Sequence, residues 1–365
     1  MKQENQKPEA QGHRRHRWYF YPGMVLLVLL LLCGGFVGFL SVTEYRPEPA
    51  EQALLGGSPT EILEGDTLRI MTFNMGYASL GTDASFVMDG GTGSGQADEE
   101  TVNRNMEGIA GILQEAGADI YMLQDIDLAS DRTFYRNQLA EFEVLLPGYE
   151  WAYAPNFRCR FVPFPFPDPF GDIDSGIATY SRFDMEDAQR ISLPNPFPWP
   201  VSMANLKRCM LCARFPIADS ERELVILNFH LEAYDSGEGK QAQTDAVLNL
   251  IRQEYEKGNY VIAGGDFNQI FPGVETVVKP TSEWVPGNLD PLPEDFDGWR
   301  YVYDDTIPSC RLLNQPYEPG DPLTQFYLID GFIVSPNVEV REVQTLNEDF
   351  RFSDHNPVRM EVRLK

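Results

Sequence analysis

The chain has 365 residues, and its 55 acidic side chains outnumber 29 basic ones, which gives a net charge of −26 at pH 7. So acidic a surface repels phosphate backbones, which argues against a protein that binds nucleic acid nonspecifically. The length suits a short N-terminal segment followed by one large domain or two small ones, and no internal repeat is present.

An uncharged apolar run occupies residues 23–43. Arginines at positions 14, 15 and 17 and the aromatic group Trp18–Tyr21 precede it, and Glu44 follows it. Such a run is long enough to cross a bilayer core as one helix, and basic residues before it favour a cytoplasmic N-terminus. We therefore predict a cytoplasmic tail at 1–17 and a transmembrane anchor at 18–43, with the rest of the chain extracytoplasmic.

Two other interpretations of this N-terminus remain open. A cleaved signal peptide is disfavoured because the apolar run is long and no Ala-x-Ala-like site follows it. A lipoprotein attached through Cys33 is disfavoured because Leu32 stands where a small residue is expected.

The segment after the anchor is rich in proline, glutamate and glycine, and it predicts an extracytoplasmic linker at 44–65. The folded domain is then expected at 66–365. Residues 1–50 hold six basic and four acidic residues, so the remainder keeps 23 basic and 51 acidic residues and a net charge of −28. Clustered acids of this kind serve solubility or bind divalent cations, and the charge alone does not choose between them.

Four cysteines follow the anchor, in a compartment where disulfides are permitted. Cys209 and Cys212 have the spacing of a redox or zinc pair, but they lie in an apolar strand-like run, and no second pair matches them. Packing thiols, or one disulfide among Cys159, Cys209, Cys212 and Cys310, are therefore favoured over a zinc site.

The domain shows several strand patterns and three helix patterns. Short runs rich in β-branched and aromatic residues predict strands at Leu68–Phe73, Asp119–Leu123, Gly176–Tyr180, Arg208–Phe215, Leu224–Phe229, Tyr260–Ala263, Phe326–Val334 and Pro357–Leu364. Apolar residues at helical spacing predict helices at Asp98–Ala116, Arg136–Leu145 and Lys240–Lys257, with Gly117 and Gly258 at two of the ends. Together they indicate a mixed α/β domain with much antiparallel sheet.

Three long loops are expected, at 83–96, 161–173 and 271–299, and loops of this length are often functional. The second is rich in phenylalanine and proline. Its side chains could contact lipid, substrate or a partner, or pack on their own domain.

Polar residues follow the predicted strands where each one ends. The chain has only four histidines, and two of them precede the membrane segment. The other two, His230 and His355, lie beside strand patterns, and imidazole both accepts and donates protons near neutral pH. Asn74, Asp125 and Asp266 occupy comparable positions. One such residue is usually a turn former, but several at successive strand ends predict a shared site.

The order of these motifs resembles the endonuclease/exonuclease/phosphatase superfamily, the deoxyribonuclease-I-like hydrolases, over residues 66–365. The most specific motifs are Gly265-Asp266-Phe267-Asn268 and Ser353-Asp354-His355-Asn356-Pro357, supported by Thr72-Phe73-Asn74, Leu123-Gln124-Asp125-Ile126-Asp127, Asp174-Ser175-Gly176-Ile177-Ala178, Asn228-Phe229-His230-Leu231 and Leu328-Ile329-Asp330-Gly331-Phe332. The resemblance implies a four-layer α/β/β/α sandwich of two mixed, mainly antiparallel sheets. It also implies hydrolysis of phosphoester bonds that depends on Mg²⁺, with Mn²⁺ or Ca²⁺ as other possible ions.

The resemblance further implies metal ligands. Asn74 and Asp125 would hold the ion directly or through water, and Asp354 would be a further ligand or an orienting group. Oxygen ligands of this kind suit Mg²⁺.

The acid–base and phosphate-binding roles follow in the same way. His355 would be the general base that activates water, oriented by Asp330. Asp266 and Asn268 would position the nucleophile and contact the phosphoryl group, and His230 would donate to a phosphate oxygen or assist the leaving group.

One residue departs from the family pattern, because Asp125 stands where the family usually has glutamate. Its side chain is shorter by roughly 1.5 Å, which puts metal affinity in question. Asp127 could help to bind the ion, or it could cap a turn near Arg132.

The substrate class stays open between a lipid headgroup, a small phosphodiester and nucleic acid. The acidic domain favours the first two, so an extracytoplasmic nuclease ranks second, and no protein partner is indicated. A non-catalytic member that binds a ligand or partner is an alternative whose only support is Asp125.

Overall fold

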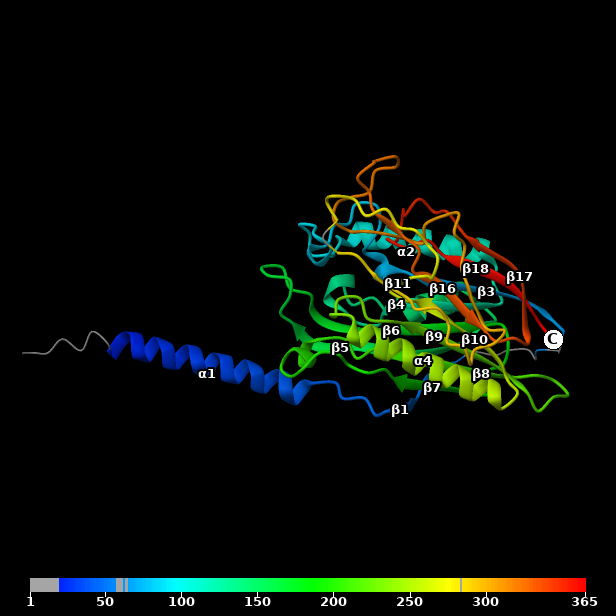
Figure 1. The fold of residues 1–365 in the computed structure, drawn as a ribbon. Helices are drawn as coiled ribbons and strands as arrows, with labels where there is room; N and C mark the ends of the chain where they lie inside the picture. The colour runs from blue at the N-terminus through cyan, green and yellow to red at the C-terminus, as the bar shows by residue number, and fades with distance from the viewer. Residues whose placement is uncertain (1–19, 57–61, 63–64, 283) are drawn as a thin grey trace, which may run out of the picture. The chain divides into compact units, whose positions relative to one another are not determined.

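The computed structural model describes residues 20–56, 62, 65–282 and 284–365 (Figure 1). The chain divides into two compact units, Met1–Thr43 and Glu44–Lys365. The first unit contains helix α1 (Phe20–Thr43), and by length and composition Tyr21–Thr43 could cross a membrane. The predicted tail at 1–17 and the first residues of the predicted anchor lie outside the described residues.

Two seven-stranded sheets form the second unit. Sheet 1 has the order β17-β18-β3-β4-β6-β5-β2, and sheet 2 has the order β1-β7-β8-β9-β10-β16-β13. The strands of sheet 1 are β2 (Leu54–Gly56), β3 (Thr67–Asn74), β4 (Ile120–Asp127), β5 (Glu150–Val162), β6 (Gly171–Ser181), β17 (Val338–Thr345) and β18 (Val358–Leu364). The strands of sheet 2 are β1 (Ala50–Gln52), β7 (Asp187–Ser192), β8 (Cys209–Pro216), β9 (Glu223–His230), β10 (Tyr260–Asp266), β13 (Arg300–Val302) and β16 (Asp330–Val334).

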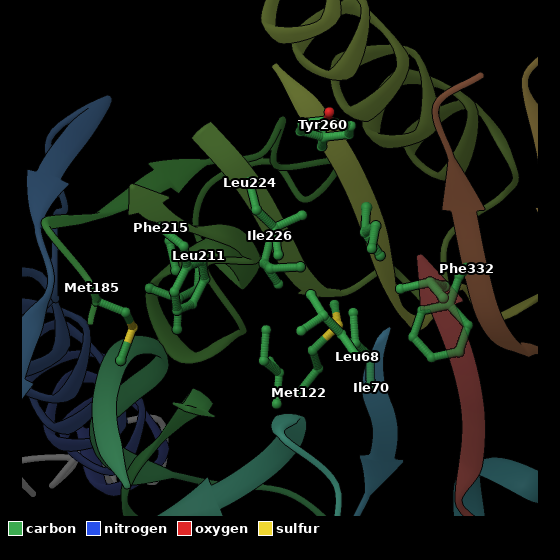
Figure 2. Packing of buried hydrophobic residues seen from close by; sticks show 14 of the residues in the cluster. Leu68, Ile70, Met122, Met185, Leu211, Phe215, Leu224, Ile226, Tyr260 and Phe332 are labelled. Carbon is green, nitrogen blue, oxygen red and sulfur yellow. The ribbon is translucent and has the colours of Figure 1, made fainter. Parts of the chain in front are cut away.

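Three helices cover the outer faces of the sheets. A central core between the sheets includes Leu68 and Met122 from sheet 1 and Leu211 and Ile226 from sheet 2, as Figure 2 shows. A second core packs α2 (Glu99–Ala116) and α3 (Gln138–Leu145) on sheet 1, and a third packs α4 (Glu238–Glu256) on sheet 2. The predicted four-layer α/β/β/α sandwich is therefore confirmed.

Each sheet is antiparallel except for one pair of neighbouring strands. In sheet 1, β3 and β4 are parallel and α2 connects them; in sheet 2, β9 and β10 are parallel and α4 connects them. Parallel neighbours need a crossover, and a helix is the usual one. Helix α2 begins and ends with residues that cap it. Asp98 accepts a hydrogen bond from the Thr101 N–H before α2, and Gly117 after it has φ +52°.

The predicted strands and helices form close to their expected positions, with one division and several additions. The strand expected at 326–334 divides into β15 (Phe326–Tyr327) and β16, and β15 pairs with β14 (Cys310–Arg311). Three longer strands, β5, β7 and β17, were not predicted, and neither were the short strands between β10 and β15. β5 contains a proline and β17 carries exposed charged residues, and in β7 the charged Arg190 is buried at an inward position. Each of these features weakens the alternation of apolar and polar residues that marks a strand in sequence.

Part of the segment expected to be a linker belongs to the sheets. Residues 50–56 form β1, which pairs with β7, and β2, which pairs with β5. Short edge strands gain their stability from the strand they pair with, so their own sequence carries little signal.

The three expected loops also contain structure. A 3-10 helix, η2 (Val87–Asp89), lies within 83–96, and β5 and β6 extend into 161–173. Within 271–299, β12 (Gly287–Asn288) pairs with β11 (Gln269–Ile270), which precedes that loop.

All five cysteines are unpaired. Cys209 faces the central core, whereas Cys212 faces the core beneath α4. Residues three apart in a strand point to opposite faces, so this pair cannot bind one metal ion. The packing-thiol interpretation therefore describes these residues, and the disulfide interpretation does not.

Candidate active site

The two parallel strand pairs bring four polar strand ends to one edge of the sandwich. Asn74 ends β3 and pairs with Gln124 in β4, beside Asp125. His230 ends β9 and pairs with Asp266, which ends β10. The carboxyl ends of parallel strands share one edge of a sheet, which is where α/β proteins commonly bind ligands. These residues line one cleft together with Asn268, Asp354 and His355.

His355 and Asp330 form a buried pair. The His355 Nδ1 lies 2.8 Å from the Asp330 Oδ2, and both side chains are almost fully buried. Ser309 donates a hydrogen bond to the same carboxylate oxygen at 2.8 Å. Burial alone would lower the pKa of His355, but the charges of Asp330 and the neighbouring acidic groups outweigh it and raise that pKa well above its usual value. A divalent cation in the cleft would act in the opposite direction.

Asp266 is the residue on which the site converges. Its Oδ2 accepts a hydrogen bond from the Asn74 Nδ2 at 3.0 Å and lies 3.3 Å from the His230 Nε2. The same oxygen lies 3.8 Å from the His355 Nε2 and 3.3 Å from the Asn268 Nδ2. Asn268, with φ +49°, also donates from its main-chain N–H to the other oxygen of Asp266 at 2.8 Å.

Asp125 reaches the site through an irregularity in β4. The register between β4 and β6 shifts between Leu123 and Ile126, and Asp125 has φ +55°. A bulge of this kind redirects a side chain. The Asp125 Oδ1 lies 3.2 Å from the His230 Nδ1. Burial opposes ionisation of Asp125, but the charges of His230, Arg132 and Arg208 outweigh it and hold its pKa well below the usual range.

Asp127 forms a buried ion pair with Arg132 and is not one of the cleft residues. Arg132 donates two hydrogen bonds to its carboxylate, at 3.0 and 2.8 Å, and the Thr133 hydroxyl donates a third at 3.0 Å. Asp127 is fully buried and does not line the cleft. Of the two roles considered for it, the local contact with Arg132 is the one observed.

The chemistry of the oxygen donors fits a divalent cation. The carboxylates of Asp125 and Asp354 and the amide oxygen of Asn74 are hard ligands that suit Mg²⁺. Burial raises the pKa of Asp354 to about 6, even though His355 and Arg311 act in the opposite direction. The Asp330 Oδ1 is also buried with no hydrogen-bond partner among the described residues. The site therefore contains buried carboxylate oxygens that a divalent cation could bind.

The described residues also contain two groups whose ligand atoms lie within 4.8 Å of one another. One comprises Cys310, Asp354 and His355, and the other comprises Asp266, Asp330 and His355. Both groups consist only of cysteine, histidine or aspartate side chains, and Asp125 belongs to neither. The predicted metal ligands thus line the same cleft, and Asp354 alone among them belongs to one of these groups.

Several cleft residues carry no signal that sequence reasoning could use. Tyr77, Asp89, Asn156, Arg208 and Arg311 all line the cleft, and Arg132 lies with its guanidinium 3.5 Å from the centre of the Tyr77 ring. Tyr77 and Asp89 lie in short 3-10 helices, Arg208 precedes β8, and Arg311 and Asn156 lie in strands that were not predicted. Only the register of the sheets places them beside the strand-end residues.

A family comparison identifies the chain. The model of the endonuclease/exonuclease/phosphatase family matches residues 71–355, which is most of the chain. This chain belongs to the endonuclease/exonuclease/phosphatase family. Members are hydrolases of phosphoester bonds, and the matched residues include both parallel strand pairs and extend to His355.

Solved structures share the endonuclease/exonuclease/phosphatase fold with this chain. One from Beutenbergia cavernae DSM 12333 has a TM-score of 0.55 at 18% identity, covering 82% of this chain and 72% of that one. One from Bacteroides vulgatus has a TM-score of 0.53 at 15% identity, covering 82% and 100%. TDP2 from Caenorhabditis elegans has a TM-score of 0.51 at 16% identity, covering 82% and 75%. No curated protein matches the sequence significantly.

Proposed function

We propose that this protein is a divalent-metal-dependent hydrolase that cleaves phosphoester bonds, chiefly phosphodiesters, on the outer side of a membrane. The observation that carries the proposal is the buried contact of 2.8 Å between the His355 Nδ1 and the Asp330 Oδ2, with the His355 Nε2 turned toward Asp266. A carboxylate on one ring nitrogen fixes the tautomer and leaves the other nitrogen to accept a proton.

In this proposal each catalytic residue has one task. His355 accepts a proton from the attacking water through Nε2, and Asp330 stabilises the imidazolium that forms. Asp266 and Asn268 hold that water and the phosphoryl group in line for attack, so that binding also orients the reacting groups. His230 donates a hydrogen bond to a phosphate oxygen or to the leaving group.

Asn74, Asp125 and Asp354 would hold the metal ion. Mg²⁺ is the ion we propose, with Mn²⁺ or Ca²⁺ as substitutes, and when bound it would neutralise the charge that develops on the phosphate oxygens. Asp125 would perform the task of the usual glutamate from its position in the β4 bulge, which supports a catalytic member over a binding-only one.

The balance of charge supports a substrate smaller than duplex nucleic acid. The chain carries a net charge of −26, and a protein that grips a DNA backbone normally offers a basic surface. We therefore propose a lipid headgroup or another small phosphodiester as the substrate, with an extracytoplasmic nuclease as the second candidate.

Hydrolysis of bis(p-nitrophenyl) phosphate by the full chain in detergent tests the activity. We expect turnover with Mg²⁺, loss of turnover with EDTA, recovery when Mg²⁺ is returned, and no turnover by His355→Ala. Equal rates under all these conditions would contradict the proposal and would favour a non-catalytic protein. Parallel assays with plasmid DNA, RNA, sphingomyelin and inositol phosphates identify the substrate class.

Protease treatment of intact cells tests the location. Cleavage of the domain only from the outside of intact cells is the expected result, because basic residues precede α1 and acidic ones follow it. Complete protection in intact cells, with cleavage after lysis, would overturn the proposed orientation.

A further inference from the structure

Two polar side chains in the cleft wall lack the hydrogen bonds that buried groups normally make. Neither the Nδ2 nor the Oδ1 of Asn156 has a partner among the described residues, and the same holds for the Nε and Nη1 of Arg208. Asn156 is 1% exposed and Arg208 is 6% exposed, and both line the cleft. Buried polar groups without partners are rare in folded proteins, so two neighbours of this kind in a cleft indicate a missing ligand.

Local structure directs both side chains into the cleft. Asn156 is the extra residue of a bulge in β5, between the pairs Pro155–Gly176 and Phe157–Ser175. Bulges redirect a side chain and recur beside active sites. The main-chain N–H of Lys207 donates to the Asn156 carbonyl oxygen at 2.7 Å, which brings the bulge next to Arg208.

Arg208 differs from the other arginines of the cleft. Arg132 is bound by Asp127. Among the described residues, Arg311 lacks a partner only at its Nε, and it donates from both terminal nitrogens to main-chain carbonyl oxygens. The Nε of Arg208 faces the Glu232 Oε2 only at 3.7 Å, which is an ion pair without a hydrogen bond. Glu232 does not line the cleft, so it balances the charge of Arg208 while the N–H groups remain available.

The position of these residues in the sheets sets them apart from Asp266 and Asp125. In sheet 2, Arg208 immediately precedes β8, two strands from β10 with Asp266; in sheet 1, Asn156 lies in β5, two strands from β4 with Asp125. His230, which ends β9, is one strand from Arg208. Neighbouring strands lie about 4.8 Å apart, so Arg208 lies roughly 10 Å from Asp266, and Asn156 lies roughly 10 Å from Asp125 on the same side. That distance exceeds the reach of the phosphoryl group that is cleaved.

We propose that Arg208 and Asn156 form a subsite for a second phosphate group of the substrate. The Nη1 of the Arg208 guanidinium and the Asn156 amide each offer a hydrogen-bond donor to the terminal oxygens of a phosphate, and the charge of the guanidinium strengthens the contact. This inference rests on the proposed function and narrows it to substrates that carry one phosphate group at the cleavage site and another about 10 Å away.

Competition against bis(p-nitrophenyl) phosphate hydrolysis tests the subsite in the full chain. The probes are propyl phosphate and the bisphosphates of propane-1,3-diol and pentane-1,5-diol, at equal free Mg²⁺. For the unaltered protein we expect the longer bisphosphate to inhibit at least ~10-fold more strongly than propyl phosphate, which is the discrimination that a charge-assisted contact supplies. In Arg208→Gln that preference should fall to about one, and Arg208→Lys should restore part of it.

Two more variants keep the result interpretable. Arg160→Gln removes the same charge from a side chain that is 69% exposed and should keep the full preference. Asn156→Ala should reduce the preference by a smaller factor, and it serves if Arg208→Gln fails to fold. Equal inhibition by the monophosphate and the bisphosphates in the unaltered protein would overturn the proposed subsite. An equal loss of inhibition by the monophosphate and the bisphosphates in the variants would overturn it as well. Absence of any hydrolysis of the diester contradicts the proposed function instead.

Discussion

At the scale of single residues, the tautomer of His355 depends on one carboxylate. Asp330 lies 2.8 Å from its Nδ1, and Ser309 holds the same oxygen. An amide at position 330 would keep the shape of the side chain but would remove the charge that stabilises a protonated imidazole. An asparagine at this position therefore tests the charge of Asp330 separately from the space that its side chain fills.

We expect Asp330→Asn to lower kcat by about 10²-fold or more, because the general base loses its orienting charge. KM should change by less than a few fold, since Asp330 does not line the cleft. Steady-state kinetics with bis(p-nitrophenyl) phosphate measures both constants. Asp297→Asn, an exposed aspartate, is the matched control and should behave as the unaltered protein. A change in KM alone would assign Asp330 to substrate binding.

Alanine substitutions at the two aspartates of β4, Asp125 and Asp127, should have different main effects. We expect Asp125→Ala to raise the Mg²⁺ concentration for half-maximal activity at least ~10-fold, because a charged ligand is lost. Its free energy of unfolding should fall by less than that of Asp127→Ala, because no arginine among the described residues donates a hydrogen bond to Asp125 in the way that Arg132 does to Asp127. An unchanged Mg²⁺ dependence would remove Asp125 from the proposed metal site.

Asp127→Ala should instead reduce stability. It leaves the buried guanidinium of Arg132 without its partner, and breaking a buried pair in this way costs about 3–5 kcal/mol. Urea unfolding followed by circular dichroism measures the loss. If the free energy of unfolding were unchanged while Mg²⁺ dependence shifted, the roles of the two aspartates would be reversed.

The sequence predicted the strand-end residues of the cleft because each one follows an apolar run. Asn74, Asp125, His230 and Asp266 were found in this way. Asn156 and Arg208 were not, because one lies in a bulge and the other precedes a strand, and neither position has a fixed pattern of neighbours. Whether a buried amide keeps its hydrogen bonds is decided by tertiary packing, which residue types do not reveal.

At the scale of elements, the close approach of β9 and β10 requires glycine. Gly265 has φ +141°, and a Cβ built there would lie 1.9 Å from the Phe229 carbonyl oxygen. The two strands are the parallel pair that ends at His230 and Asp266. Gly265 therefore fixes the spacing of two site residues although it makes no contact with a substrate.

We expect Gly265→Ala to lower the free energy of unfolding by more than ~3 kcal/mol or to prevent folding, because backbone atoms cannot move aside cheaply. Gly111→Ala is the matched control, since Gly111 is exposed in α2 and a Cβ there meets nothing within 4 Å. That variant should gain about 0.5–1 kcal/mol. Thermal and urea unfolding of both proteins checks the pair, and equal stabilities would contradict the argument.

The elements with strong periodicity were predicted well, and the weak ones were missed for identifiable reasons. The stripe of α2 and the alternation of β18 both survive in the burial of their residues. β5 escaped prediction because Pro155 and two bulges break its pattern. β1 and β2 are three residues each, too short for any period to appear.

At the scale of the whole molecule, the folded unit begins soon after α1. β1 and β2 complete one edge of each sheet, so residues 50–56 protect two strands that would otherwise expose unpaired main-chain groups. A protein that begins at residue 57 loses both edge strands, whereas one that begins at Glu44 keeps them.

We expect residues 57–365 to unfold at a lower urea concentration than residues 44–365 and to aggregate more readily at equal concentration. The reason is the loss of the hydrogen bonds between β1 and β7 and between β2 and β5. Equilibrium unfolding and light scattering of the two proteins provide the comparison. Identical midpoints and identical scattering would show that these strands contribute nothing to the edges.

The unpaired cysteines have a practical consequence. With no disulfide among the five, the native fold needs no oxidant, and the protein should mature equally well in reducing and oxidising surroundings. Four of the thiols are buried, and burial raises the pKa of Cys209 to about 11 and that of Cys310 to about 12. Alkylating reagents attack the thiolate, so these thiols do not react until the domain unfolds locally or globally. The rate of their labelling therefore measures how often the domain opens, without any added probe.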